Sequence, residues 1–137
     1  RPDGYWRVRD SGTPKVIALE VERSTKQESE YESIARFYDD HSEIAQVIWA
    51  ADGASLVDKI HEIAQRVSRQ AFKHSFVLLD PLCRLGWRTS IIRGQDQGKT
   101  INEILRNTTR TGAAHVPHQF LLDTRKTPHR SKRYEHF

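Results

Sequence analysis

Cysteine and methionine are almost missing from this 137-residue chain, which has one cysteine, Cys83, and no methionine. A single cysteine can form no internal disulfide and supplies too few thiolates for a cysteine-based zinc site. We therefore predict a reducing, cytoplasmic setting and an inert, semi-buried Cys83 side chain. Because even an initiating methionine is lacking, we expect an excised domain or processed fragment, with a further domain upstream of Arg1.

Long apolar runs are lacking as well. Runs such as residues 76–79 fall far short of the roughly 20 residues that a membrane span needs, and the polar first residues do not resemble a signal peptide. We therefore expect no membrane partner. Hydrophobic residues make up 36% of the chain and charged residues 29%, which is typical of a globular protein whose length suits one domain.

A glycine-rich nucleotide loop is also absent. No G-x-x-x-x-G-K-[ST] or G-x-G-x-x-G motif follows an expected strand. The segment GQDQGKT at residues 94–100 ends like a phosphate loop, but three residues separate its glycines where four are needed. We therefore do not expect a nucleotide-binding fold of either kind.

Positive charge, by contrast, is in excess. Lysine and arginine number 22 against 18 acidic residues, a net charge of +4, and this excess suits a phosphate-rich partner such as DNA. The last segment is especially basic. We predict a domain over residues 1–123 and a basic C-terminal tail over residues 124–137, which is either solvated or in contact with a nucleic-acid backbone.

The order of apolar and turn residues predicts the fold class. Alternation and turn signals indicate strands at 4–10, 15–23, 44–51, 76–80, 87–93 and 119–123. Helical spacing indicates helices at 26–41, capped by Ser24 or Thr25, at 55–69, capped by Ser55, and at 100–107. The first two strands should form a hairpin. Helices and strands that alternate after it predict an α/β fold, in which a mixed central sheet is flanked by helices.

Three acidic residues can converge on the predicted hairpin. Glu20 and Glu22 point to one face of their strand because side chains alternate, and Ile17, Leu19 and Val21 point to the other. A turn centred near residues 11–12 places Asp3 across from Glu20, and a register one pair longer places it across from Glu22, so Asp3 can share their face in either case. Carboxylates so close repel one another unless a cation neutralises them, and such hard oxygen ligands suit Mg²⁺ or Mn²⁺.

Lys26 follows Glu22 by four residues and can reach back to the same group. A bound cation would lower the pKa of water and offset charge on a phosphate, and a lysine would orient the water or stabilise the developing charge. This combination predicts phosphodiester hydrolysis or transfer. The alternative is surface decoration, in which both glutamates lie on an exposed face and Glu22 pairs with Arg7 or Arg23.

The segments Arg1-Pro2-Asp3-Gly4 and Glu20-Val21-Glu22-Arg23-Ser24-Thr25-Lys26, followed by a helix to Tyr38, resemble the PD-(D/E)XK nuclease superfamily. More narrowly, they resemble the replication-relaxation family, which includes the MobC-type conjugative relaxases. The resemblance covers roughly residues 1–81. It implies a restriction-endonuclease-like fold, with Asp3 and Glu20 as metal ligands in a magnesium- or manganese-dependent site.

The chain departs from that pattern at one position. Where the superfamily usually has lysine, this sequence has Glu22, and the resemblance makes Lys26 the displaced lysine. Glu22 is then either a third metal ligand or a general base. Relatives in the narrower family often carry a winged-helix DNA-binding domain upstream, which fits the expectation of a fragment.

Several other residues have possible roles. Arg1, Lys26 and Arg36 are the candidate DNA-binding residues, because each can contact a phosphate. Tyr31 and Tyr38 either pack in the core or border the acidic group, where a tyrosine would also be a conceivable covalent nucleophile. His115 and His118 are three residues apart but lack an acidic or cysteine partner for a metal site.

The sequence therefore predicts a metal-dependent DNA endonuclease that nicks DNA, with relaxase-like action in plasmid mobilisation or replication implied by the resemblance. Its catalytic residues would be Asp3, Glu20, Glu22 and Lys26, the first three of them metal ligands. The alternative is a catalytically inactive DNA-binding accessory protein, which the replacement of the expected lysine by Glu22 favours. A general host-directed nuclease and a protein-interaction domain are further hypotheses.

Overall fold

A computed structural model of the chain describes residues 1–9 and 14–110. Its centre is a four-stranded sheet in the order β1-β2-β3-β4. The strands are β1 (Gly4–Val8), β2 (Lys15–Glu22), β3 (Ile44–Ala51) and β4 (His74–Leu78). β1 is antiparallel to β2, whereas β2, β3 and β4 run parallel. The prediction of an α/β fold with a mixed sheet is thus confirmed.

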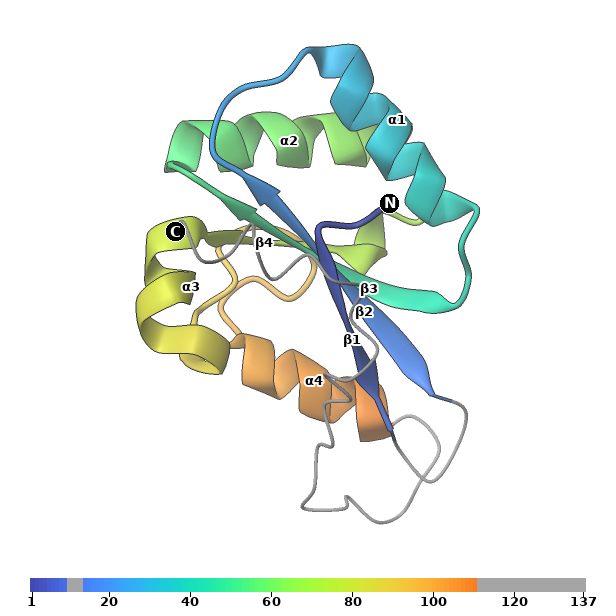
Figure 1. The fold of residues 1–137 in the computed structure, drawn as a ribbon, viewed down its shortest axis with the longest axis vertical. Coiled ribbons are helices and arrows are strands. Elements are labelled where there is room, and N and C mark those ends of the chain that lie inside the picture. Colours follow the sequence, from blue (N-terminus) through green and yellow to red (C-terminus); the bar gives the residue numbers. More distant parts are fainter. Residues whose placement is uncertain (10–13, 111–137) are drawn as a thin grey trace.

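The helices form a layer on each face of the sheet (Figure 1). α1 (Glu28–Asp39) and α2 (Ala54–Val67) are the crossovers between the parallel strands and pack against each other on one face. α3 (Leu79–Leu85) and α4 (Ile101–Arg110) lie on the other face. Two short 3₁₀ helices, η1 (Ala71–Lys73) and η2 (Gly86–Arg88), complete the described elements.

Each face of the sheet carries its own hydrophobic core. On the α1 and α2 face, Trp49 and Phe76 stack in parallel and are completely buried. On the opposite face, Ile17 and Leu19 of β2 pack with the apolar stripe of α4. The predicted inward side of β2 therefore faces α4, and Glu20 and Glu22 consequently face the layer that contains α1.

Both crossover helices begin differently from the prediction. Gln27, rather than Ser24 or Thr25, is the N-cap of α1, and the carboxylate of Glu30 accepts a hydrogen bond from its backbone N–H. The N-cap of α2 is Gly53, not Ser55. Gly53 has a φ of 104°, a backbone conformation that glycine adopts more readily than other residues. Capping signals were therefore found in the correct segments but at the wrong residues.

The prediction was also wrong in the region after β4. That strand ends at Leu78, and Asp80 and Pro81 belong to the first turn of α3, where proline is tolerated because its missing N–H has no partner there. Residues 87–93, predicted as a strand, contain η2 and two isolated β-bridges. The predicted strand 119–123, the tail 124–137, His115 and His118 lie outside the described residues.

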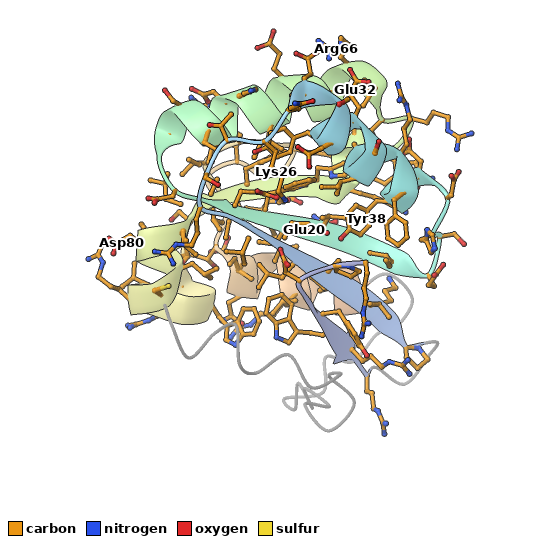
Figure 2. All side chains as sticks on the ribbon, turned by 45° about the horizontal axis from the view of Figure 1, so that its top comes forward. Glu20, Lys26, Glu32, Tyr38, Arg66 and Asp80 are labelled. Carbon is orange, nitrogen blue, oxygen red and sulfur yellow. The ribbon has the colours of Figure 1, made fainter. Side chains whose placement is uncertain are left out.

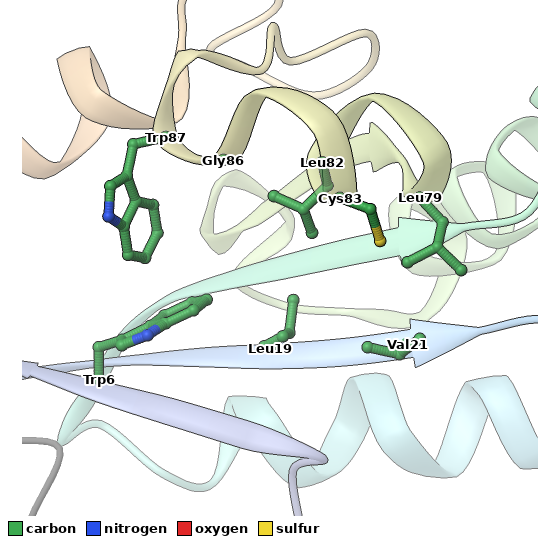
Figure 3. A pocket seen from close by; sticks show the side chains of 8 residues that line it. All are labelled: Trp6, Leu19, Val21, Leu79, Leu82, Cys83, Gly86 and Trp87. Atoms are coloured by element: carbon green, nitrogen blue, oxygen red, sulfur yellow. The ribbon is translucent and has the colours of Figure 1, made fainter. Parts of the chain in front are cut away.

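A cavity of about 380 Å³ opens between β2 and α3, on the face of the sheet away from Glu20 and Glu22. Figure 3 shows Leu19 and Val21 on the strand side and Leu82 and Cys83 on the helix side. Cys83 is exposed, not semi-buried as predicted, because it lies in α3, which has no buried residue. Trp6 and Trp87 meet edge to face at its end, with ring centroids 4.7 Å apart. Among residues 1–9 and 14–110, no helix has the length and apolarity to cross a membrane.

Candidate acidic site

The acidic residues lie near the carboxyl end of β2, beside the crossover to α1. In sheets with parallel strands this end commonly forms the binding site, because the loops that follow the strands converge there. The next parallel strand, β3, contributes to the same edge, since the N–H of Asp52 donates to the carbonyl oxygen of Glu22 at 2.8 Å. The fold therefore fixes the backbone of Glu22 against the end of β3.

Asp3 reaches this group from β1. Gly4 pairs with Leu19, so the same antiparallel register places Asp3 beside Glu20, as the hairpin pattern predicts. Oδ2 of Asp3 accepts a hydrogen bond of 3.0 Å from the N–H of Val21. That bond anchors Asp3 to the backbone between the two glutamates. The negative charge of Asp3 raises the pKa of Glu20 and of Glu22.

Glu20 is buried rather than displayed on an open strand face. It is 5% exposed, and its Oε1 accepts a hydrogen bond from the hydroxyl of Tyr38 on α1. Figure 2 shows Glu20 and Tyr38 between the sheet and α1, whereas Asp80 lies apart on α3. Burial, opposed by the Tyr38 hydrogen bond and assisted by Asp3 and Glu22, raises the pKa of Glu20 to about 7.

Glu22 pairs with Lys26. Nζ of Lys26 lies 2.7 Å from Oε1 of Glu22, with the lysine side chain 38% exposed and the glutamate 2% exposed. Burial raises the pKa of Glu22 despite the opposing effect of Lys26. Burial lowers the pKa of Lys26, but the hydrogen bond and charge of Glu22 outweigh it, so the net change is upward. The expectation that Lys26 reaches the acidic group is met, and the suggested pairs of Glu22 with Arg7 or Arg23 are not what the structure shows.

Tyr31 holds the loop that carries Lys26. Its hydroxyl accepts a hydrogen bond of 3.0 Å from the N–H of Lys26 and donates one of 3.4 Å to the carbonyl oxygen of Ser24. Lys59 of α2 lies over the Tyr31 ring, 6.0 Å from its centroid. The crossover between β2 and α1 is therefore held in a defined shape, with a second cation nearby.

Tyr31 and Tyr38 border the acidic group and also pack in the core, so both of the roles considered for them apply at once. Tyr31 is 1% exposed and Tyr38 is completely buried. Burial, reinforced by Glu20, raises the pKa of Tyr38, which keeps the phenol protonated. A buried, protonated hydroxyl already bonded to a carboxylate acts as a donor and not as a nucleophile toward DNA.

Negative charge exceeds positive charge in this group. Asp3 raises the pKa of both Glu20 and Glu22, Glu22 also raises that of Glu20, and all three carboxylates favour the charged form of Lys26, whose pKa is raised. In the arrangement seen, no three carboxylate, imidazole or thiol side chains of the described residues are placed to hold a metal ion. Carboxylate oxygens are the donors that hard divalent cations prefer, so the chemistry of Asp3, Glu20 and Glu22 suits such an ion, but the three side chains would have to move to hold one.

The other predicted DNA-binding residues lie differently. Arg36 is 58% exposed on α1 and pairs with Glu32 at 3.5 Å, so the structure does not bring it into the acidic group. Arg1 is exposed, next to Pro2 and Asp3. Lys26 is bonded directly to a predicted metal ligand, Glu22.

The raised pKa of Glu20 predicts a pH-dependent stability. Between its ordinary pKa of 4.5 and the folded value of about 7, the folded protein binds more protons than the unfolded chain. Stabilisation by the protonated form is therefore complete below pH 4.5 and is lost as the pH rises through 7. A Glu20→Gln variant cannot ionise, so it should gain on the order of 3 kcal/mol over the wild type between pH 4.5 and pH 8.

Chemical denaturation of both proteins at each pH tests this expectation. The difference between the two is the informative quantity, because His74, whose pKa burial lowers to about 4, gives the wild type a slope of opposite sign between pH 4 and 6.5. Glu20→Gln retains His74, so that background cancels. A difference that stays constant with pH would show that Glu20 titrates normally.

Sequence reasoning missed the specific contacts of the site. It did not assign Tyr38 to Glu20 or Tyr31 to Lys26, although both lie seven residues apart on one face of α1. One alternative from the sequence placed both tyrosines beside the acidic group, and their shared face is the signal that favours that alternative. Lys59 carries no such signal, since only the packing of α2 beside α1 brings it there.

Comparisons of the chain with protein-family models, curated proteins and solved structures give no significant match. The resemblance to nucleases therefore stays a prediction that depends on the short motifs around Asp3 and Glu20.

Proposed function

We propose that the chain is a divalent-metal-dependent DNA endonuclease that nicks one strand, with relaxase-like action in plasmid mobilisation or replication as the setting that the sequence resemblance implies. The observation that carries the proposal is the strand register that places Asp3 beside Glu20 on β2, together with the 2.7 Å contact of Lys26 with Glu22 at the carboxyl end of that strand. The net charge of +4 supports DNA as the partner. The lone Cys83 supports work in the reducing cytoplasm.

Asp3, Glu20 and Glu22 would hold Mg²⁺ or Mn²⁺, which lowers the pKa of bound water and offsets charge on a phosphate. The other steps belong to the residues of the chain. Lys26 leaves Glu22 and turns its ammonium toward the phosphate or the attacking water. Glu22 completes the ligand shell or accepts a proton from that water. Lys26 is suited to this change because its side chain is partly exposed.

Nicking of supercoiled plasmid tests the proposal. Wild-type protein should convert supercoiled DNA to the open circle in Mn²⁺ or Mg²⁺ and stop when EDTA is added. Binding to a labelled duplex should weaken as salt rises, because lysine and arginine contacts to phosphates release counterions. A protein that binds DNA without nicking it in either cation would contradict the enzymatic proposal.

One observation favours the inactive accessory protein as a second candidate. Glu20 and Glu22 are already partnered within the chain, by Tyr38 and Lys26. If those contacts persist in the presence of cations, the acidic group is structural and the protein binds DNA without chemistry. The same plasmid assay separates the two functions, since only the nuclease needs a cation to change the DNA.

A further inference from the structure

The cavity between β2 and α3 lies on the face of the sheet opposite the acidic residues, and the proposed nuclease chemistry does not use it. Its volume of about 380 Å³ falls within the range of roughly 300–1,000 Å³ that is typical of small-molecule sites. The described residues that line it include no lysine, arginine, histidine, aspartate or glutamate. Water is held poorly in such a space, because it needs polar partners there. The cavity therefore suits an uncharged, apolar ligand.

The helix side of the cavity is packed loosely. None of the residues of α3 is buried, and Leu79 and Leu82, which line the cavity, are half-buried. A helix on a sheet ordinarily buries its apolar side chains against that sheet. Figure 3 shows these two leucines facing β2 across the cavity, so part of their apolar surface stays in contact with water. A ligand between α3 and β2 would remove that surface from water, which favours binding.

Two tryptophans give the cavity a preference for an aromatic ligand. Trp6 and Trp87 are half-buried, and both line the cavity. Their ring centroids lie 4.7 Å apart and their planes meet at 69°. Two rings at that angle form a corner, in which a third ring can stack on one indole and meet the other with its edge. An aliphatic chain gains no contacts of this kind.

We propose that the cavity is a binding site for a small, flat, uncharged aromatic molecule, held between β2 and α3 and against Trp6 and Trp87. The inference does not rest on the proposed metal-dependent function, because no residue of the acidic group lines the cavity. Cys83 lines it from α3 and is exposed. Its thiol therefore reports whether the cavity is occupied.

Titration of the full chain with N-phenylnaphthylamine, an uncharged fluorescent aromatic compound, tests the proposal. Its emission should rise to saturation at one equivalent, while tryptophan emission falls through energy transfer from Trp6 and Trp87. Iodoacetamide should alkylate Cys83 about tenfold more slowly when the compound is present at about ten times its dissociation constant, because only unoccupied protein exposes the thiol. Decanol, an uncharged aliphatic competitor, should displace the compound poorly.

Cys83→Phe and Leu85→Phe are a matched pair of variants on the same helix. Cys83→Phe places a ring in the cavity and should weaken binding of the compound at least about tenfold. Leu85 is 43% exposed and is not among the described residues that line the cavity, so Leu85→Phe should keep the wild-type affinity. If Cys83→Phe fails to fold, alkylation of Cys83 in the folded wild-type protein with N-ethylmaleimide blocks the cavity and should weaken binding in the same way.

Three results would each overturn the proposal. The first is a wild-type protein that shows no saturable binding of N-phenylnaphthylamine. The second is an affinity that blocking position 83 leaves unchanged, and the third is displacement by decanol as effective as displacement by a second aromatic compound, naphthalene. A dimer that Cys83→Phe dissociates, in a protein that does not bind the compound, would assign the cavity to a second copy of the chain instead.

Discussion

Glu20→Gln should abolish Mn²⁺-dependent nicking while leaving the protein folded. Glutamine keeps the shape of the side chain, and its amide oxygen can still accept the hydrogen bond from Tyr38. It cannot supply the negative charge that a hard cation requires. We expect the rate of conversion of supercoiled plasmid to fall at least about a hundredfold, because losing a ligand should cost more than losing a residue that only supports one.

Glu62→Gln is the control for this variant. Glu62 is exposed on α2, so the same chemical change there should leave the nicking rate and the Mn²⁺ affinity at their wild-type values. Thermal unfolding of all three proteins in EDTA checks that they are folded. A Glu20→Gln protein that nicks as fast as wild type would remove Glu20 from the catalytic group.

The second large effect concerns the pair between Glu22 and Lys26. Lys26→Met keeps an unbranched apolar side chain, one atom shorter than lysine, but leaves the nearly buried Glu22 carboxylate without its ammonium. Breaking a buried pair is costly, although the partial exposure of Lys26 reduces the cost, so the variant should lose about 1–3 kcal/mol of stability in EDTA at pH 7.5. Saturating Mn²⁺ should restore most of that loss.

The same variant should separate binding from catalysis. Wild-type protein must release Lys26 from Glu22 before both acids can hold a cation, and Lys26→Met is spared that step. We expect it to bind Mn²⁺ more tightly than wild type, as titration calorimetry would show, and yet to nick DNA more slowly, because the ammonium that acts on phosphate or water is gone. Weaker Mn²⁺ binding by Lys26→Met would contradict a competition between lysine and metal.

Lys99→Met provides the comparison for a surface pair. Lys99 pairs with Asp96 at 3.2 Å, with the lysine 47% exposed and the aspartate 23% exposed. Exposed pairs contribute about 0–1 kcal/mol, so this variant should change stability little and should not respond to Mn²⁺ differently from wild type. An equal metal response in both lysine variants would show that the response is not specific to the acidic group.

The parts of the site that depend on local rules could be predicted from the sequence. Strand alternation places Glu20 and Glu22 on one face, and the antiparallel pairing of β1 with β2 puts Asp3 beside Glu20, which is one of the two registers that the sequence allowed. The four-residue spacing from Glu22 is enough to bring Lys26 back to it. Local backbone geometry sets these relations, so they do not depend on how distant parts of the chain pack.

The burial of the acids could not be obtained in this way. An alternating strand looks the same whether its polar face is open or covered, and α1 covers it only because the crossover returns over that face. The contact of Tyr38 with Glu20 joins residues 18 positions apart and depends on how α1 is placed on the sheet. Long-range packing, not local pattern, decides such contacts.

The region after β4 shows a different limit. Residues 87–93 are rich in β-forming side chains, yet Gly86 adopts a φ of 55° and begins a 3₁₀ turn that carries Trp87 to Trp6. The packing of Trp87 against Trp6 thus goes with a 3₁₀ turn, although the β propensity of these residues favours a strand. Ile91 still reaches the core on the α4 face, so the apolar pattern correctly marked burial while misidentifying the element.

The most direct test of the central claim is a crystal soaked in Mn²⁺, with anomalous diffraction recorded at the manganese edge. The proposed function predicts a peak bounded by the carboxylates of Asp3, Glu20 and Glu22, with the Lys26 ammonium moved away from Glu22. An undisturbed Glu22–Lys26 pair with no peak among the three carboxylates would contradict it.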